Sequence, residues 1–284
     1  MNNVLLFFLC TILIIGLFII YYYRMYVIPT YAAHEHEIIN SPRININYMD
    51  GVDVIYWINL DRSNDRRIQM SRVFQDPVFQ NMKIERVSAV DGKNPEAVYR
   101  RLKFMYKQKN DYEYACMLSH LDTIRKFSQT SYDVGLIMED DLTMELRKYW
   151  RKSVQEIIDG APSDWEIIQL CYNTQANIKN FSLYERNVRN KTVCAAAYLI
   201  RNQAAKRLIS EIYSGGKYNL EHYIIHHADC YIFNKLVTYT YKYPYFIYMT
   251  NNNSLLHPED LKSHERSKRQ VLEMFKGLTN KNMS

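Results

Sequence analysis

The chain has 284 residues, of which 48% are hydrophobic and 23% are charged, and Lys and Arg outnumber Asp and Glu by 36 to 30. These proportions are typical of a folded globular protein and exclude a largely disordered chain. The net charge of +6 is spread along the chain apart from a basic C-terminal segment, and no zinc-finger or RNA-binding signature is present. Nucleic acid is therefore not an expected partner.

The five cysteines do not suggest a metal or disulfide framework. They are widely spaced, at positions 10, 116, 171, 194 and 230, and no CxxC pair occurs. Buried free thiols are the simplest interpretation. One or two disulfides remain open as an alternative if the domain faces an oxidising lumen.

Residues 4–23 form an uncharged apolar and aromatic run of 20 residues. A helix of that length crosses a bilayer, so we predict a single-pass transmembrane anchor over residues 1–24 and a stalk over residues 25–51. A cleaved signal peptide is the alternative, which the lack of basic residues before the run disfavours. The few charges beside the run leave open whether the main domain faces the cytosol or the lumen of the endoplasmic reticulum or Golgi.

From residue 52 onward, apolar runs alternate with segments of helical periodicity. The runs at 52–60, 83–90, 134–138, 165–172 and 194–200 predict buried strands, and the TYTYKYPYFIY run at 238–248 predicts a half-buried one. Helices are predicted over 63–74, 118–127, 146–158 and 205–212, the last ended by Gly215-Gly216. This pattern favours an α/β domain over 52–260, with a mainly parallel sheet covered on both faces, followed by a basic polar tail over 261–284.

Three consecutive acids, Glu139, Asp140 and Asp141, directly follow the predicted strand at 134–138. Clustered carboxylates at the end of a buried strand repel one another unless a cation or hydrogen-bond donors neutralise them. If the strand continues, Glu139 and Asp141 share one face and Asp140 points away. Mg²⁺ or Mn²⁺ is the natural partner of such oxygen ligands, whereas a solvated acidic turn is the alternative.

Five segments in a fixed order carry a family resemblance: INLDRSNDRR at 58–67, SAVDGK at 88–93, LSHL at 118–121, LIMEDD at 136–141 and AAAYLIRNQAAKRLI at 195–209. Together they resemble glycosyltransferase family 25, which includes bacterial lipooligosaccharide galactosyltransferases and collagen galactosyltransferases. The resemblance implies a GT-A-type nucleotide-sugar fold, with inverting transfer from a nucleotide sugar, often UDP-galactose, and with Mn²⁺. One departure is Tyr114-Ala115, where the family often has glycine before the Cys-x-x-Ser-His stretch.

The resemblance also implies roles for individual residues. The donor nucleotide sugar is expected to contact residues near the ends of the first strands and in the helix at 118–127: Asn59, Asp61, Arg62, Arg66, Asp91, Ser119 and His120. Asp141 is expected to be the main metal ligand, supported by Asp140 and Glu139. His257 is a further candidate ligand, because enzymes of this fold often complete the metal site from that region.

Inverting transfer needs a general base that deprotonates the acceptor hydroxyl. Asp229 is the candidate, and Glu166 is the reserve. The leading hypothesis is a membrane-anchored glycosyltransferase that transfers galactose from a UDP-sugar to a glycan, glycolipid or protein hydroxyl. The alternatives are an inactive anchored binding protein, which the intact acidic triplet disfavours, and a metal-dependent nucleotide-sugar hydrolase, for which no HD, DxH or HExxH cluster is present.

Overall fold

The computed structural model describes residues 12–13, 15–18, 46–104, 111–220, 227–249 and 261–281. The chain divides into two units, one of residues 46–279 and one of residues 1–45 with 280–284. Within the described ranges, no helix is long and apolar enough to cross a membrane. Most of the span predicted at 4–23 and of the stalk lies outside the described residues, so the anchor stays a prediction.

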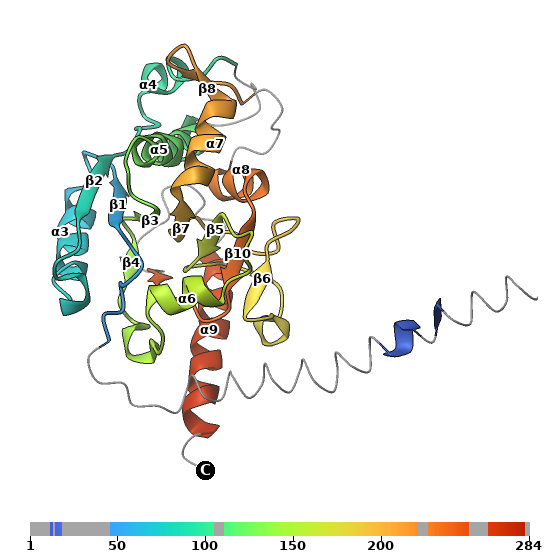
Figure 1. Ribbon diagram of the computed structural model, residues 1–284. Helices are drawn as coiled ribbons and strands as arrows, with labels where there is room; N and C mark the ends of the chain where they lie inside the picture. Colours follow the sequence, from blue (N-terminus) through green and yellow to red (C-terminus); the bar gives the residue numbers. More distant parts are fainter. Residues whose placement is uncertain are drawn as a thin grey trace, which may run out of the picture. The chain divides into compact units, whose positions relative to one another are not determined.

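A seven-stranded sheet forms the centre of the larger unit, in the order β2-β1-β3-β7-β5-β10-β6 (Figure 1). Its strands are β1 (Val54–Asn59), β2 (Ile84–Ser88), β3 (Val134–Glu139), β5 (Ile167–Gln169), β6 (Tyr184–Arg186), β7 (Ala197–Arg201) and β10 (Thr238–Tyr241). β7 is antiparallel to β3 and β5, and β6 is antiparallel to β10. The other five strands run in one direction, which confirms the prediction of a mainly parallel sheet.

Helices and short elements connect these strands. The described α-helices of this unit are α3 (Asn64–Val73), α4 (Pro95–Tyr99), α5 (Asp111–Ser128), α6 (Val154–Gly160), α7 (Asn202–Ile212), α8 (Ala228–Lys235) and α9 (Leu261–Lys281). Single-turn 3₁₀ helices are η2 (Pro77–Phe79), η3 (Arg147–Tyr149) and η4 (Ile178–Asn180). Two small antiparallel sheets pair β4 (Leu142–Thr143) with β11 (Ile247–Tyr248) and β8 (Tyr213–Ser214) with β9 (Lys217–Tyr218).

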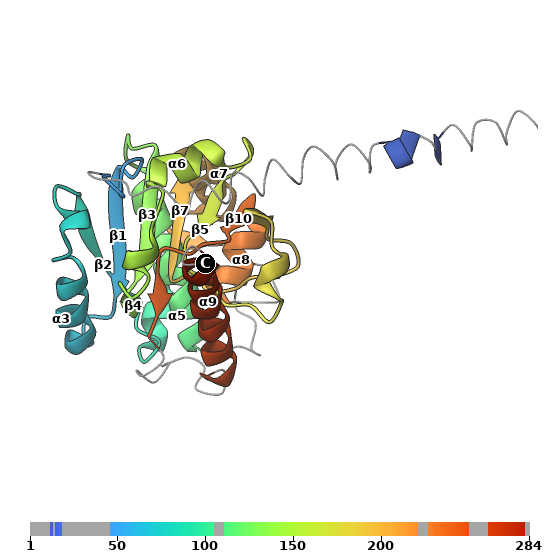
Figure 2. The same cartoon turned by 90° about the horizontal axis from the view of Figure 1, so that it is seen from below.

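Both faces of the sheet are buried, because successive strand residues alternate between two apolar clusters. In β1, Val54, Tyr56 and Ile58 face the cluster that includes α5, α7 and α8. Ile55 and Trp57 face the opposite cluster, to which α6 contributes. Figure 1 shows α5, α7 and α8 grouped together and α6 apart from them, and Figure 2 shows β1, β3, β7 and β5 side by side in the sheet. This arrangement explains why the strands read as continuous apolar runs rather than as alternating ones.

Three local predictions were wrong. α7 ends at Ile212, and Gly215 and Gly216 form the turn between β8 and β9, where φ values of +60° and +77° suit a tight hairpin that needs two positive φ angles. The helix expected over 146–158 is split into η3 and α6, and Ser153 with Glu156 forms a capping box that starts α6. The run at 238–248 is split into β10 and β11 around Pro244.

The segment predicted as a basic polar tail forms α9, which is amphipathic. Val271 and Phe275 are buried on its inner side. They pack in a third apolar cluster with Leu146 and Tyr172, which lie far away in the sequence. α9 therefore belongs to the packed unit up to residue 279.

Gly135 lets α5 pack closely against β3. A Cβ atom at this position meets the ring of Phe127 at 3.0 to 3.1 Å, and that ring is fully buried. We expect Gly135→Ala to lower the free energy of unfolding by about 1 to 2 kcal/mol, because overpacking outweighs the gain from removing a flexible glycine. Denaturant titration measures the change.

Gly277→Ala is the matched control. Gly277 lies in α9, and nothing lies within 4 Å of the added Cβ. This change is expected to raise stability by about 0.5 to 1 kcal/mol. Equal effects of the two substitutions would contradict the packing argument.

Candidate active site

A cavity of about 490 Å³ opens at the edge of the sheet where the parallel strands end. Its lining includes the residues that follow β1, β2, β3 and β5, and also residues 193–196 that precede β7. Because β7 runs in the opposite direction, its start lies at the same edge as the ends of its neighbours. This edge is where ligands bind in open α/β sheets. α5, the start of α8 and two residues of α9 complete the described walls.

Asp140 is a buried anchor between three elements. Asn59 Nδ2, at the end of β1, donates to Asp140 Oδ2 at 2.6 Å, and Arg66 Nη1, on α3, donates to Asp140 Oδ1 at 2.8 Å. Burial opposes the charge of Arg66, but Asp140 and Asp141 outweigh it and raise the pKa of the guanidinium. Both oxygens of Asp140 therefore already have positive or polar partners, which suits a supporting role better than a direct one.

Asp141 is in the opposite situation. Its Oδ1 is buried and has no hydrogen-bond partner among the described residues. Burial, and then the charge of Glu139, raise the pKa of Asp141 from 3.8 to about 7, although Arg66 opposes this rise. A buried carboxylate oxygen without a partner fits a divalent cation with oxygen ligands.

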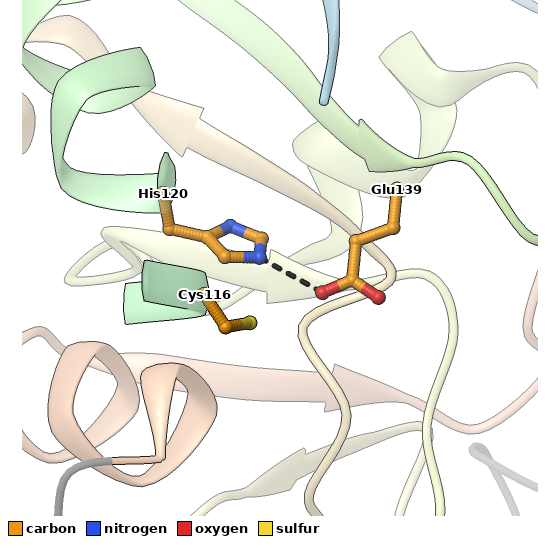
Figure 3. A group of neighbouring side chains, drawn as sticks. All are labelled: Cys116, His120 and Glu139. Atoms are coloured by element: carbon orange, nitrogen blue, oxygen red, sulfur yellow. Dashed lines mark hydrogen bonds and ion pairs between the residues drawn. The ribbon is translucent and has the colours of Figure 1, made fainter. Parts of the chain in front are cut away.

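The side chain of Glu139 contacts α5. β3 ends at Glu139, so the alternation expected through Asp141 does not continue, and all three acids line the cavity. Glu139 Oε1 lies 2.9 Å from Nε2 of the buried His120. Figure 3 shows this pair with Cys116, which lies one helical turn before His120. The ligand atoms of these three side chains all lie within 4.8 Å of one another.

Arg62 and Ser119 also line the cavity, and Asp91 lies beside it. Arg62 Nε donates to Asp91 Oδ2 at 2.8 Å, and this hydrogen bond is the main cause of the lowered pKa of Asp91. Ser119 Oγ accepts a hydrogen bond from the amide of Val90 at 2.8 Å and donates to Ala115 O. The hydroxyl of Ser119 therefore connects α5 to the end of β2.

Asp61 does not reach the cavity, although the sequence placed it with the donor residues. Its carboxylate is 72% exposed. It forms an ion pair with Arg86 and accepts a hydrogen bond from Ser88 Oγ at 2.7 Å. These contacts hold the carboxylate beside β2.

The two candidate bases lie in different places. Asp229 lines the cavity, where Oδ2 accepts from the amide of Cys194 at 2.6 Å and Oδ1 from that of Cys230 at 2.7 Å. Glu166 precedes β5 at the opposite edge of the sheet and is bound by Arg207 and by the amide of Val237. The structure therefore brings Asp229 to the site and leaves Glu166 away from it. His257 lies outside the described residues.

Sequence reasoning missed several residues of the cavity. Cys116 and Cys194 were interpreted as buried thiols or, alternatively, as disulfide partners, yet both line the cavity. Cys194 has a φ of +88°, a conformation that non-glycine residues rarely adopt, and its Sγ lies 3.9 Å from that of Cys171. Ser263 and His264 of α9 were assigned to a separate tail. For Cys116, the available signal was its position four residues before His120, but the helix predicted over 118–127 began after Cys116, whereas α5 begins at Asp111.

A mainly parallel sheet with an acidic cavity at the carboxyl ends of its strands defines an α/β protein with a built ligand site. A sequence model described as glycosyltransferase family 25 (LPS biosynthesis protein) matches residues 52–224, more than half of the chain. The chain therefore belongs to glycosyltransferase family 25.

Curated relatives agree with this assignment. Procollagen galactosyltransferase 2 of Mus musculus is 30% identical over 133 aligned positions, and the match covers 42% of this chain and 21% of that protein. A glycosyltransferase 25 family member of Aedes aegypti is 27% identical over 205 aligned positions, and the match covers 64% of this chain and 33% of that protein. The chain thus spans between about a fifth and a third of these relatives. Among solved structures, HddC from Yersinia pseudotuberculosis covers 78% of this chain, and 82% of HddC is covered, at 13% identity and a TM-score of 0.34.

The raised pKa of Asp141 makes stability depend on pH. Without metal, the folded protein holds this proton up to about pH 7, whereas an unperturbed carboxyl loses it near 3.8. The folded state then binds more protons between these values, so stability falls as pH rises from about 4 to 7. We expect wild type in EDTA to lose up to about 4 kcal/mol relative to Asp141→Asn over this interval, as measured by urea unfolding.

Glu96→Gln, which removes an exposed carboxylate at the start of α4, serves as the control. Parallel pH profiles for wild type and Asp141→Asn would disprove the coupling.

Proposed function

We propose that this protein is a glycosyltransferase that transfers galactose from UDP-galactose to a hydroxyl group of a glycan, glycolipid or protein, with inversion at the anomeric carbon. One observation carries the proposal: in a chain of family 25, Glu139, Asp140 and Asp141 line the same cavity as Asn59 and Arg66. The name of the procollagen relatives supports galactose as the sugar. Residues 4–23 anchor the enzyme to a membrane in this proposal, because they form an uncharged run of spanning length.

The donor binds with its diphosphate near Asp141 and Arg66. The oxygen of Asp141 that lacks a hydrogen-bond partner, with Glu139 nearby, would hold Mn²⁺, and the ion would stabilise the negative charge of the leaving diphosphate. Arg66 adds a positive charge whose position Asp140 determines. Arg62 and Asp91, linked to each other near the ends of β1 and β2, contact the uridine.

Inversion places the acceptor hydroxyl on the face of the sugar opposite the diphosphate. The hydroxyl oxygen forms a bond to the anomeric carbon while the bond from that carbon to the diphosphate oxygen breaks. Asp229 takes the hydroxyl proton, since each of its oxygens accepts one backbone amide and keeps a second lone pair. The two amide hydrogen bonds also orient the carboxylate toward one position in the cavity wall.

Binding of UDP tests the donor site without requiring an acceptor. Calorimetry of the purified full-length protein is expected to show UDP binding that depends on Mn²⁺. Asp141→Asn is expected to weaken it at least about tenfold, because one ligand contributes more than about 1.4 kcal/mol. Glu166→Gln, at the opposite edge of the sheet, is the matched carboxylate control. A folded protein that binds neither UDP, GDP nor CMP would refute the proposal.

The substitution Asp229→Asn tests whether Asp229 acts as the general base or contributes to donor binding. Loss of a general base lowers turnover by about 10² to 10⁴. UDP affinity is expected to stay within about threefold of wild type, since this change is worth less than about 0.7 kcal/mol. Initial rates with UDP-galactose and a responding acceptor, together with UDP titrations, measure both quantities. A large loss of UDP affinity would assign Asp229 to donor binding instead.

A further inference from the structure

Cys116, His120 and Glu139 form a compact group in the cavity wall that the proposed transfer reaction does not fully use. Cys116 and His120 are one helical turn apart on α5, so they share a face of the helix. Glu139 approaches them from the end of β3, with its Oε1 2.9 Å from His120 Nε2. Figure 3 shows all three side chains converging on one point, with ligand atoms within 4.8 Å of one another.

The chemistry of this group differs from that of the acidic triplet. A thiolate, an imidazole and a carboxylate are the ligands that Zn²⁺ prefers, at bond lengths of about 2.0 to 2.3 Å. Mg²⁺ and Mn²⁺ prefer oxygen ligands such as those of Asp141. Small movements of these side chains suffice to place a tetrahedral ion between the three ligand atoms.

His120 is already oriented as a metal ligand. Its Nδ1 lies 3.2 Å from the hydroxyl of Tyr198, and both side chains are buried. With metal bound, the proton of the ring would lie on Nδ1 and be donated to Tyr198, and the lone pair of Nε2 would face the ion in place of the hydrogen bond to Glu139. Such an outer hydrogen bond fixes the tautomer of a ligating histidine.

The charge around the group favours a cation. Five carboxylates line the described part of the cavity, against the two guanidinium groups of Arg62 and Arg66.

We infer that Cys116, His120 and Glu139 bind a divalent transition metal, with Zn²⁺ preferred, at a site distinct from the oxygen ligands around Asp141. Three protein ligands leave a fourth position open. All three residues line the cavity, so that position is available to water or to an oxygen of a bound molecule. The inference holds whether or not the protein transfers sugar.

Cobalt tests the site because a thiolate bound to Co²⁺ gives an intense near-ultraviolet charge-transfer absorption, which oxygen ligands do not give. Full-length protein, purified and freed of metal with EDTA, is titrated with Co²⁺ and then with Zn²⁺. One Co²⁺ per chain is expected to produce the absorption, and Zn²⁺ is expected to abolish it by displacement. Asp141→Asn is expected to keep the absorption, which separates this site from the proposed Mn²⁺ site.

Cys116→Ser is expected to remove the absorption and to weaken Zn²⁺ at least about 100-fold. Cys230→Ser, which alters another cysteine of the cavity wall, is the matched control; it is expected to keep the Co²⁺ absorption and the Zn²⁺ affinity of wild type. His120→Gln gives a second loss of affinity that does not depend on the thiol. Tyr198→Phe is expected to weaken Zn²⁺ by about 10- to 100-fold through the outer hydrogen bond.

Co²⁺ binding without the thiolate absorption would overturn the inference. A second outcome would also overturn it: Asp141→Asn abolishes Zn²⁺ binding, while Cys116→Ser and His120→Gln leave the Zn²⁺ affinity unchanged. The ion would then occupy the oxygen site around Asp141.

Discussion

The buried carboxylate of Asp140 connects the parts of the site. It receives hydrogen bonds from Asn59 at the end of β1 and from Arg66 on α3, so one side chain joins three elements. Asn59 in turn accepts a hydrogen bond from Arg86, in the middle of β2. Removing one partner of such a buried group leaves an uncompensated charge, which is costly. The positions of Glu139 and Asp141, on either side of Asp140, depend on this network.

The three neighbouring acids at this edge of the sheet differ in how their charge is balanced. Arg66 forms an ion pair with Asp140, whereas Asp141 keeps a buried oxygen without a hydrogen-bond partner in the described ranges. Glu139 is turned toward His120. Three adjacent acids thus have three different environments, and clustered carboxylates take separate roles when their surroundings differ in this way. The unbalanced negative charge provides the physical basis for binding a cation here.

α5 brings chemistry to the cavity that no strand provides. Its buried face packs on β1 through Phe127 and Tyr56, while Cys116, Ser119 and His120 lie in the cavity wall. Ser119 connects the helix to the end of β2, and Gly135 allows the close approach to β3. The same helix is therefore both a core element and a part of the site, because its register on the sheet determines where His120 meets Glu139.

The sequence by itself determined the α/β class, the strands of the central sheet except β6, and the position of three acids at the end of β3, because apolar periodicity and strand ends are local properties of the chain. Its ordered motifs also indicated the family. Only the tertiary structure decided that Asp140 is paired with Asn59 and Arg66, that His120 and Cys116 lie beside Glu139, and that Glu166 lies at the edge of the sheet opposite the cavity. These outcomes depend on contacts between residues far apart in the chain, and on which end of a strand a residue occupies after folding. The glycines of the β8–β9 hairpin and the packed face of α9 were misassigned for the same reason. Whether a glycine pair ends a helix or forms a hairpin turn, and whether a helix face is buried, depends on the segments that pack against it.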